Sequence, residues 1–249
     1  MDLVRSPLFS SCILPLNCIQ DTTQASQTRC FISYFDLSTN FPWRDPRPEQ
    51  IERRRALLDD KLIFDLLLSS GGVKRPDALY PPTDVPSLRQ LLDAIESSSY
   101  DALKKECLVY YLLKWHQDGR EERFQIEHCI PPHFAALSDA YWLLDTGTNV
   151  PRAISILSDA RLNKDYPSKI LKAISLLPNH STLLVKYVRT AKPTLTEVND
   201  LETYVTALAE SSLSEAWGFQ RTFGEANTNR SRLFKKLLEW CVTREWSSR

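Results

Sequence analysis

The positions of the prolines constrain this chain more than any other feature of its sequence. The 249 residues include fifteen prolines and only six glycines. Proline disrupts a helix interior, because it lacks a backbone donor and clashes with the preceding turn, but it suits first helical turns and loops. The prolines of this chain lie between apolar-periodic segments or at the start of one. This placement predicts a series of helices separated by short turns.

Apolar residues recur at helical spacing along most of the chain after Pro48. The first such segment predicts one helix from Pro48 to about residue 70, ending at Gly71. A short helix follows Asp84, a plausible N-cap, and a longer one from about residue 100 ends at Gly119. Further helices are predicted at about 131–146, 150–158, 165–177, 180–191, 195–210, 213–223 and 230–246.

The turn between the helices predicted at 131–146 and 150–158 contains residues suited to helix ends. Gly147 can supply a left-handed turn, and Asn149 can cap the next helix. The small residues Ala136, Ala140 and Ala153 should let the two helices approach closely around this turn. A strand is conceivable only in the segment CFISYF (30–35). The predicted fold class is therefore all-α, an irregular α-solenoid of consecutive antiparallel helices.

The domain organisation predicted from these patterns has two parts. Residues 1–47 form an amino-terminal arm that is partly extended. Its first 30 residues show no period, and its remainder combines aromatic residues with stiffening prolines. This aromatic part should lie across the helical body, because it cannot bury its rings by itself. Residues 48–249 form a single α-helical domain.

Composition argues against several classes of function. The chain carries 31 basic and 31 acidic residues, so no net field attracts nucleic acid or an anionic membrane. No apolar run approaches the about 20 residues of a membrane span, and Pro7 and Pro15 interrupt the apolar amino terminus, which argues against a secretory signal. Six cysteines without a CxxC pair favour reduced thiols in cytosol or nucleus. A weak nucleic-acid contact stays open only in the mildly basic segment 219–249.

Catalytic arrangements can be drawn from the sequence, but none is favoured. Cys107, His116 and Asp118 could form a nucleophile arrangement, yet Cys107 lies in an apolar helix where cysteine usually fills space. Asp139 and Asp145 are six residues apart and face different sides of their helix, which argues against paired acid/base work. The sequence has no glycine-rich phosphate loop. We therefore predict no catalytic residue, no cofactor and no small-molecule substrate.

The segment HCIPPH brings three potential metal ligands together, namely His128, Cys129 and His133. A zinc site needs about four ligands, and no matching pair occurs elsewhere in the sequence. Pro131 and Pro132 instead predict a helix start, with His133 in the exposed first turn. We therefore predict no metal site.

Aromatic residues are the best indicators of the core and of an interface. Phe41 and Trp43 lie outside any predicted helix, beside Pro42, and are the candidate protein-interface residues. In the alternative interpretation, both rings pack on the first helix of the same chain, near Ile51 and Leu58. Most of the helical tryptophans should be core residues; they are Trp115, Trp142, Trp217, Trp240 and Trp246.

Four segments, taken in order, resemble a known family. They are RRALLDDKLIFDLLL, LYPPTDVPSLRQLLDAI, PPHFAALSDAYWLLDTG and VPRAISILSDARLNKDYPSKILKAI. Together they resemble the α-helical ELYS-type domain, found in a nucleoporin of the Y-shaped outer-ring subcomplex of the nuclear pore. The resemblance covers about residues 35–225.

The resemblance implies a non-enzymatic scaffold nucleoporin at the nuclear envelope that docks on other Y-complex nucleoporins. We expect the short, fungal-type version, without the amino-terminal β-propeller and the long carboxy-terminal tail of the animal form. We therefore expect no chromatin contact of the kind made by that tail. The alternative is a helical-repeat adaptor of another large assembly, such as a vesicle coat or a proteasome lid.

Overall fold

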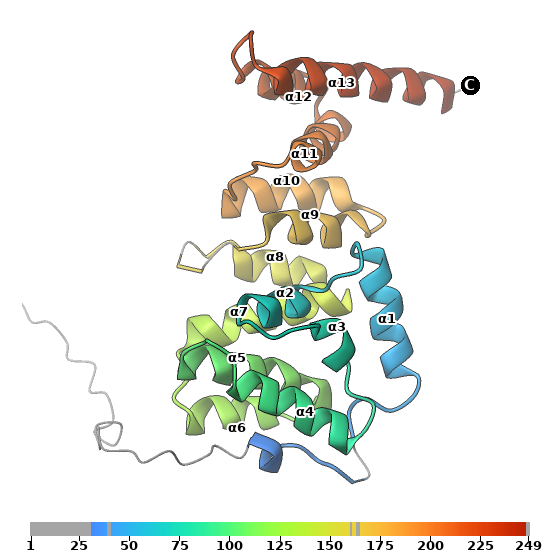
Figure 1. Ribbon diagram of the computed structural model, residues 1–249. Coiled ribbons are helices and arrows are strands. Elements are labelled where there is room, and N and C mark those ends of the chain that lie inside the picture. The colour runs from blue at the N-terminus through green and yellow to red at the C-terminus, as the bar shows by residue number, and fades with distance from the viewer. Residues whose placement is uncertain (1–30, 39–40, 160, 163–164, 248–249) are drawn as a thin grey trace, which may run out of the picture. The chain divides into compact units, whose positions relative to one another are not determined.

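In the computed structural model, the described residues are 31–38, 41–159, 161–162 and 165–247, with side chains up to Thr243. They form thirteen α-helices and two 3₁₀ helices and include no β-strand (Figure 1), which confirms the all-α prediction. The elements are η1 Phe31–Tyr34, α1 Arg47–Leu57, α2 Ile63–Ser70, α3 Pro76–Leu79, α4 Val85–Glu96, α5 Ala102–Leu113, η2 Lys114–His116, α6 Arg120–Glu127, α7 Pro132–Thr146, α8 Val150–Leu157, α9 Pro167–Ser175, α10 His180–Ala191, α11 Val198–Ser211, α12 Leu213–Arg221 and α13 Thr228–Ser247.

Helix ends follow the sequence signals closely. Proline occupies the first or second position of α1, α3, α4, α7, α8 and α9. The Asp84 carboxylate accepts the Ser87 N–H at 2.7 Å, which confirms the predicted cap of α4. Gly147 ends α7 with φ +72°, as expected. Asn149 occupies the predicted N-cap position of α8, but its φ of +43° differs from the extended backbone typical of an N-cap and its side chain makes no capping bond.

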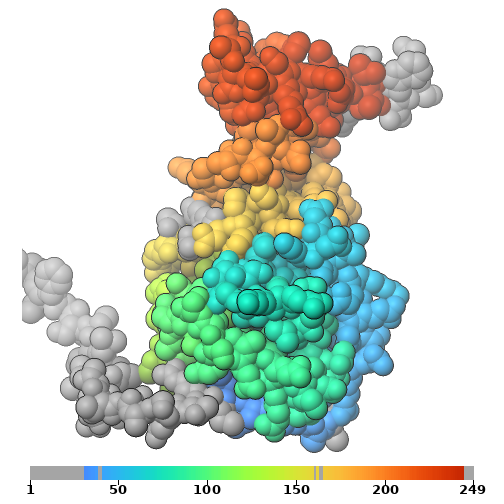
Figure 2. All heavy atoms as spheres, in the orientation of Figure 1, coloured from blue at the N-terminus to red at the C-terminus, as the bar shows by residue number. Residues whose placement is uncertain are grey.

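The helix α7 is the centre of the amino-terminal half, and it packs on α1, α2, α5 and α8. Its contact with α8 is the most extensive of any helix pair. Ala140 and Ala153 are fully buried, which agrees with the predicted close approach, whereas Ala136 is half-buried. Trp115 and Trp142 are both buried and meet edge to face at 5.4 Å. On the face drawn in Figure 2, α2 and α3 (teal) lie against α4 and α5 (green).

Beyond α8 the helices stack in sequence order, from yellow to red in Figure 1. The helix α10 contacts α8, α9 and α11, and α11 in turn contacts α12 and α13. One hydrophobic cluster of buried residues runs from Phe31 to Leu237 through both halves. Each helix thus buries its apolar side on its neighbours, as in an irregular α-solenoid.

The helix predicted over 48–70 is two helices, α1 and α2, and this prediction is wrong. Asp59 and Asp60 between them have φ of +54° and +56°. Aspartate tolerates this left-handed conformation better than most residues. From α9, the Lys169 ammonium donates to the carbonyl of Leu58, and Lys172 forms a 3.0 Å ion pair with Asp59. Distant lysines therefore hold a turn that local periodicity does not reveal.

Three other local expectations differ from the structure. The helix expected to reach Gly119 ends as α-helix at Leu113 and continues as η2, after which Gln117 has φ +55°. The helices α3 and α6 were not predicted, because each is only one or two turns long. The segment CFISYF forms the 3₁₀ helix η1 over its described residues rather than a strand.

Residues 31–38 and 41–46, here called the strap, pack on the helical body. Contacts divide the chain into residues 1–30 and 31–249, whereas the sequence analysis placed a boundary at residue 47. The Arg120 guanidinium donates to the Tyr34 carbonyl at 2.8 Å, and the Tyr34 ring meets Phe124 edge to face at 4.8 Å. These contacts are those of an aromatic segment lying across helices. The predicted arm over 1–30 lies outside the described residues, and the domain assignment stays a prediction.

Candidate functional site

The candidate interface residues Phe41 and Trp43 are buried within their own chain. Trp43 is 1% exposed and Phe41 is 8% exposed. Their rings meet edge to face at 5.7 Å, and Trp43 also lies 6.2 Å from the Phe35 ring. The two side chains are thus members of the hydrophobic core. Burial leaves open whether the strap as a whole docks on a partner, so that role stays a prediction.

Two adjoining grooves lie beside the strap and share Arg47, Gln50 and Trp115. The first, of about 410 Å³, is also lined by Phe41 and His116. The second, of about 210 Å³, is lined in addition by other polar and aromatic side chains. The Arg47 guanidinium is engaged by the carbonyls of Pro42 at 2.6 Å and Trp115 at 2.9 Å. The grooves therefore have rigid walls fixed by bonds within the chain.

The second groove contains hydrogen-bond donors that the described residues do not satisfy. The Trp142 indole N–H and the Arg54 Nε are buried and have no acceptor among the described residues. Burial lowers the pKa of Arg54, and its Nη2 donates to the Leu144 carbonyl at 2.9 Å. A buried donor without an acceptor costs free energy. These two groups therefore favour binding of an acceptor from another molecule, such as the carboxylate of a partner protein.

The residues of the conceivable nucleophile arrangement have separate environments, and both ring nitrogens of His116 are buried without a hydrogen-bond partner among the described residues. Burial raises the pKa of the Cys107 thiol to about 12, so the reactive thiolate is absent at neutral pH. Burial likewise lowers the pKa of His116 to about 4. Asp118 is held by Arg120 through bonds of 2.9 Å and 2.6 Å, which lower the pKa of that carboxyl to about 2. These environments are typical of residues that stabilise the fold rather than of a nucleophile and its base.

The three potential metal ligands also have structural surroundings. The His128 ring contacts the Glu106 carboxylate at 3.2 Å and the Tyr34 hydroxyl at 3.1 Å, and it stacks on Phe124 at 4.1 Å. His133 is exposed in the first turn of α7 and Cys129 is exposed in the turn before it. Within the described part of the chain, no group of three potential ligands surrounds a common point. His128 instead joins the strap to α5 and α6.

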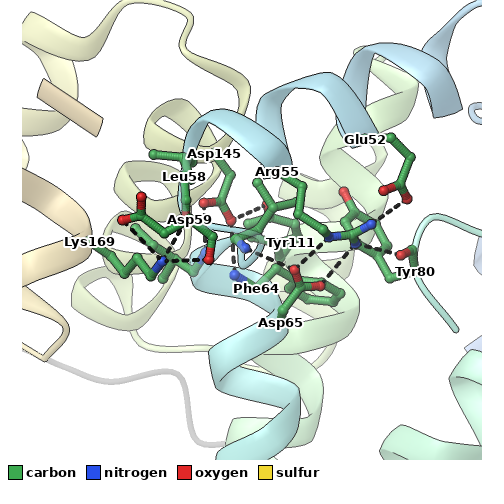
Figure 3. Close-up of polar contacts among 12 residues, drawn as sticks. Glu52, Arg55, Leu58, Asp59, Phe64, Asp65, Tyr80, Tyr111, Asp145 and Lys169 are labelled. Carbon is green, nitrogen blue, oxygen red and sulfur yellow. Dashed lines mark hydrogen bonds and ion pairs between the residues drawn. The ribbon is translucent and has the colours of Figure 1, made fainter. Parts of the chain in front are cut away.

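Asp139 and Asp145 face different partners, in agreement with the sequence analysis. Asp139 forms a 2.6 Å ion pair with Lys114 and accepts the Tyr110 hydroxyl at 3.0 Å. Asp145 lies in the polar cluster of Figure 3 and accepts the backbone N–H groups of Ile63 at 2.8 Å and Phe64 at 2.9 Å. It thereby caps the amino terminus of α2 from α7.

The environment of Asp145 is fully buried. Its carboxylate also accepts the Tyr111 hydroxyl at 2.9 Å. Burial raises the pKa of this carboxyl to about 7, although the three hydrogen bonds favour its charged form. A carboxyl with such a pKa could serve as a general acid or base. Here both carboxylate oxygens of Asp145 accept hydrogen bonds from groups of the core, namely two backbone N–H groups and a tyrosine hydroxyl.

A buried ion pair completes the polar cluster. The Arg55 Nε donates to Asp65 at 2.8 Å, and the Arg55 Nη2 donates to the Tyr80 carbonyl at 2.6 Å (Figure 3). Asp65 also accepts the Leu62 N–H at 2.8 Å, at the start of α2. The pair therefore joins α1, α2 and the segment after α3. All of these groups stabilise the turn between α1 and α2.

Sequence analysis missed an exposed apolar surface on the last two helices, here called the α12–α13 patch. Trp217, predicted to be a core residue, is 42% exposed, because Ala216 and Gln220 occupy the inner face of α12. Trp240 is partly buried, and the side chain of Trp246 lies outside the described residues. A second apolar row at four-residue spacing on α13 could have revealed the surface. The patch consists of Leu213, Trp217, Phe234, Leu238 and Val242.

Comparison with known proteins gives a consistent result. A family model described as ELYS, nuclear pore complex assembly, matches residues 61–249. The uncharacterized protein ely5 of Schizosaccharomyces pombe is 28% identical over 195 residues, which are 77% of this chain and 64% of that protein. The chain thus spans less than two thirds of the relative's length. In the described part of the chain, no helix is long and apolar enough to cross a membrane. Since the family model covers most of the chain, the protein belongs to the ELYS family of nuclear pore complex assembly.

Proposed function

We propose that this chain is a non-enzymatic scaffold subunit of the Y-shaped outer-ring subcomplex of the nuclear pore. The observation that carries the proposal is the match of residues 61–249 to the nuclear pore assembly family. The structure supports it, since Asp118, His128 and Asp145 are engaged in contacts within the chain. The chain acts by docking on other nucleoporins at the nuclear envelope.

The grooves beside the strap are the proposed docking site for one neighbouring subunit. Support comes from the unsatisfied donors of Arg54 and Trp142, which suit an acidic side chain. The rigid walls reduce the entropy cost of binding. Phe41 and Trp43 contribute by holding the strap against the groove rather than by touching the partner.

Localisation tests the proposal directly. The full chain, tagged at its genomic locus, should give a punctate nuclear rim, and its purification should recover outer-ring nucleoporins as judged by mass spectrometry. The free tag is the control. A signal on vesicles or proteasomes, with recovery of their subunits, would establish the adaptor alternative instead.

A matched pair of substitutions tests the groove. Gln50→Glu places a negative charge on the rim, and Gln90→Glu makes the same change on the exposed face of α4. We expect the first to weaken recovery of one outer-ring subunit by about tenfold and the second to leave recovery unchanged. Equal recovery by both variants would exclude the groove as a docking site.

A further inference from the structure

The helices α12 and α13 leave an apolar face uncovered at the end of the stack. Their inner residues Ala216 and Leu233 are fully buried, and both helices pack on α11. On the outer side, Trp217 is 42%, Leu238 49% and Val242 55% exposed. Large exposed apolar side chains that gather on one surface mark an interaction site more often than scattered ones do.

The members of the α12–α13 patch form one surface. The rings of Trp217 and Phe234 meet edge to face at 5.5 Å across the two helices. Phe234, Leu238 and Val242 follow each other at intervals of four residues and therefore share one face of α13. The chain reverses in residues 222–227. Leu213 lies one turn before Trp217 on α12 and is 46% exposed.

Charge around the patch has a positive surplus. Glu215 and Glu202 are paired with Arg189 and Arg232 from neighbouring elements. Among the side chains described up to Thr243, four cations and two acids remain on the last turn of α12, the turn after it and α13, which leaves a surplus of two positive charges in this group. These groups are Arg221, Arg230, Lys235 and Lys236 against Glu225 and Glu239. Within the described residues, no carboxylate forms an ion pair with Arg221.

A groove of about 330 Å³ is lined by Trp217 and Phe234 and also by Arg221 and Arg230. Gln220 lines this groove and is 3% exposed, yet its Oε1 accepts no hydrogen bond from the described residues. A buried acceptor without a donor costs free energy. The missing donor therefore points to a polar group from a bound partner.

We propose that the α12–α13 patch binds an amphipathic helix of another protein, with apolar residues on one face and acidic residues along its flanks. This inference rests on the proposed scaffold function, and it specifies the class of partner that binds at a second docking surface. Inside the chain, the apolar faces of α8 to α11 are each covered by a following helix. The outer face of α12 and α13 is the same kind of surface without its cover.

Charge and the groove distinguish this partner from other occupants. A second copy of the chain would place one positive surplus against another across a two-fold axis. An anionic lipid surface would satisfy the charge, but acyl chains offer no donor to Gln220. An acidic helix satisfies both the charge and the apolar surface, and its polar side chains can donate to Gln220.

Site-specific photo-crosslinking of the full chain in cells tests the proposal. A photoreactive phenylalanine analogue replaces Leu238, and the control carries it in place of Ile126, an apolar residue on α6 that is 77% exposed. We expect position 238 to cross-link to a helical segment of another protein, rich in Glu and Asp, at a yield at least about tenfold above position 126. The cross-linked peptide is identified by mass spectrometry.

A charge reversal provides the second measurement. Arg221→Glu should reduce the cross-link from position 238 by about fivefold. Arg89→Glu, the same change on the exposed face of α4, should leave it unchanged. Flotation of the purified protein with vesicles of phosphatidylcholine and phosphatidylserine should give no binding.

Four results would overturn the proposal. They are a cross-link to another copy or to the chain's own residues, a cross-linked peptide without acidic character, a yield equal to that of position 126, and vesicle binding that Leu238→Ser abolishes. The scaffold function is judged separately from localisation of the wild-type chain. A chain that reaches the nuclear rim without the expected cross-link contradicts this inference alone, whereas a chain absent from the rim contradicts the scaffold function.

Discussion

Two tryptophans on helices have opposite environments in this protein. Trp142 is 8% exposed and packs against Trp115 at the centre of the molecule, whereas Trp217 is 42% exposed on α12. Removing a ring from a packed core costs transfer free energy and leaves a cavity, but removing one from the surface does not. The same residue type therefore contributes to stability at one position and is available for binding at the other.

Trp142→Ala should lower the free energy of unfolding by about 3–5 kcal/mol, because the cavity would lie among α1, η2 and α7. Trp217→Ala is the matched control and should change it by less than about 1 kcal/mol. Urea denaturation followed by circular dichroism measures both. Similar midpoints for the two variants would contradict the assigned environments.

Asp145 gives the stability a pH dependence. Burial raises the pKa of its carboxyl from 3.8 to about 7 in the folded protein. Between these values the folded chain keeps a proton that the unfolded chain has released. The contribution of Asp145 to the free energy of unfolding is therefore greatest below about pH 4, falls as the pH rises to about 7, and is constant above that.

Comparison of the wild type with Asp145→Asn isolates this effect, because other groups such as His116 contribute equally to both proteins. The difference in free energy of unfolding, wild type minus variant, should decrease by up to about 4 kcal/mol from pH 4 to pH 7. Urea titrations at intervals of pH measure it. A difference that stays constant, or that grows with pH, would show that the carboxyl is charged throughout.

At the scale of single elements, helix ends depend on groups far away in the sequence. Gly147 ends α7 with φ +72°, and a Cβ at this position would lie 3.1 Å from the Cζ of Arg54 on α1. Arg54 donates there to the carbonyl of Leu144 in the last turn of α7. A glycine is therefore required both by the backbone conformation and by the approach of the arginine.

Gly147→Ala should lower the free energy of unfolding by more than about 1 kcal/mol. Gly218→Ala is the matched control, since it lies inside α12 with open space around its added Cβ, and it should raise stability by about 0.5–1 kcal/mol. Thermal denaturation of the two variants gives shifts of opposite sign. A stabilising Gly147→Ala would contradict the assigned helix end.

The strap is the second element whose role depends on distant packing. Because Phe41 and Trp43 are buried, their double substitution by Ala should lower the melting temperature by more than 10 °C, given about 3 kcal/mol or more for each ring. Partner recovery at low temperature should persist in part. Loss of recovery with an unchanged melting temperature would instead show that the rings themselves dock.

At the scale of the whole described unit, the packing is uneven along the chain. The helix α7 packs on α1, α2, α5, α8 and α9, which come from both earlier and later sequence, whereas the main contacts of α13 are with α11 and α12. Among the described side chains of α13, Leu233 and Leu237 are the buried ones. In a stacked array, a terminal helix opens at a lower free energy than a central one.

Hydrogen exchange should therefore be graded along the chain. Amides of α12 and α13 should exchange faster than those of α5 and α7 by at least about a hundredfold, as measured by mass spectrometry of peptides. Binding of a partner helix to the α12–α13 patch would slow exchange there selectively. Equal protection in α7 and α13 would mean that the unit opens only as a whole.

The sequence by itself determined the helical class and most helix positions. Proline placement and apolar period are local properties, and a residue such as Pro132 or Asp84 acts within its own turn. The ordered motifs likewise resembled the family that the comparison confirmed. The burial of individual rings was not determined in this way, since aromatic content does not reveal what covers a ring. The sequence left Phe41 and Trp43 open between an interface and the chain's own core, and it placed the exposed Trp217 in the core.

Tertiary structure decided what depends on contacts between distant segments. The turn at Asp59 and Asp60 is fixed by lysines of α9, and the start of α2 is capped by Asp145 of α7. The burial of Trp43 and the exposure of Trp217 follow from which helix lies next to each ring. Such outcomes are set by free energies of packing summed over the whole core, to which the local pattern contributes only a part.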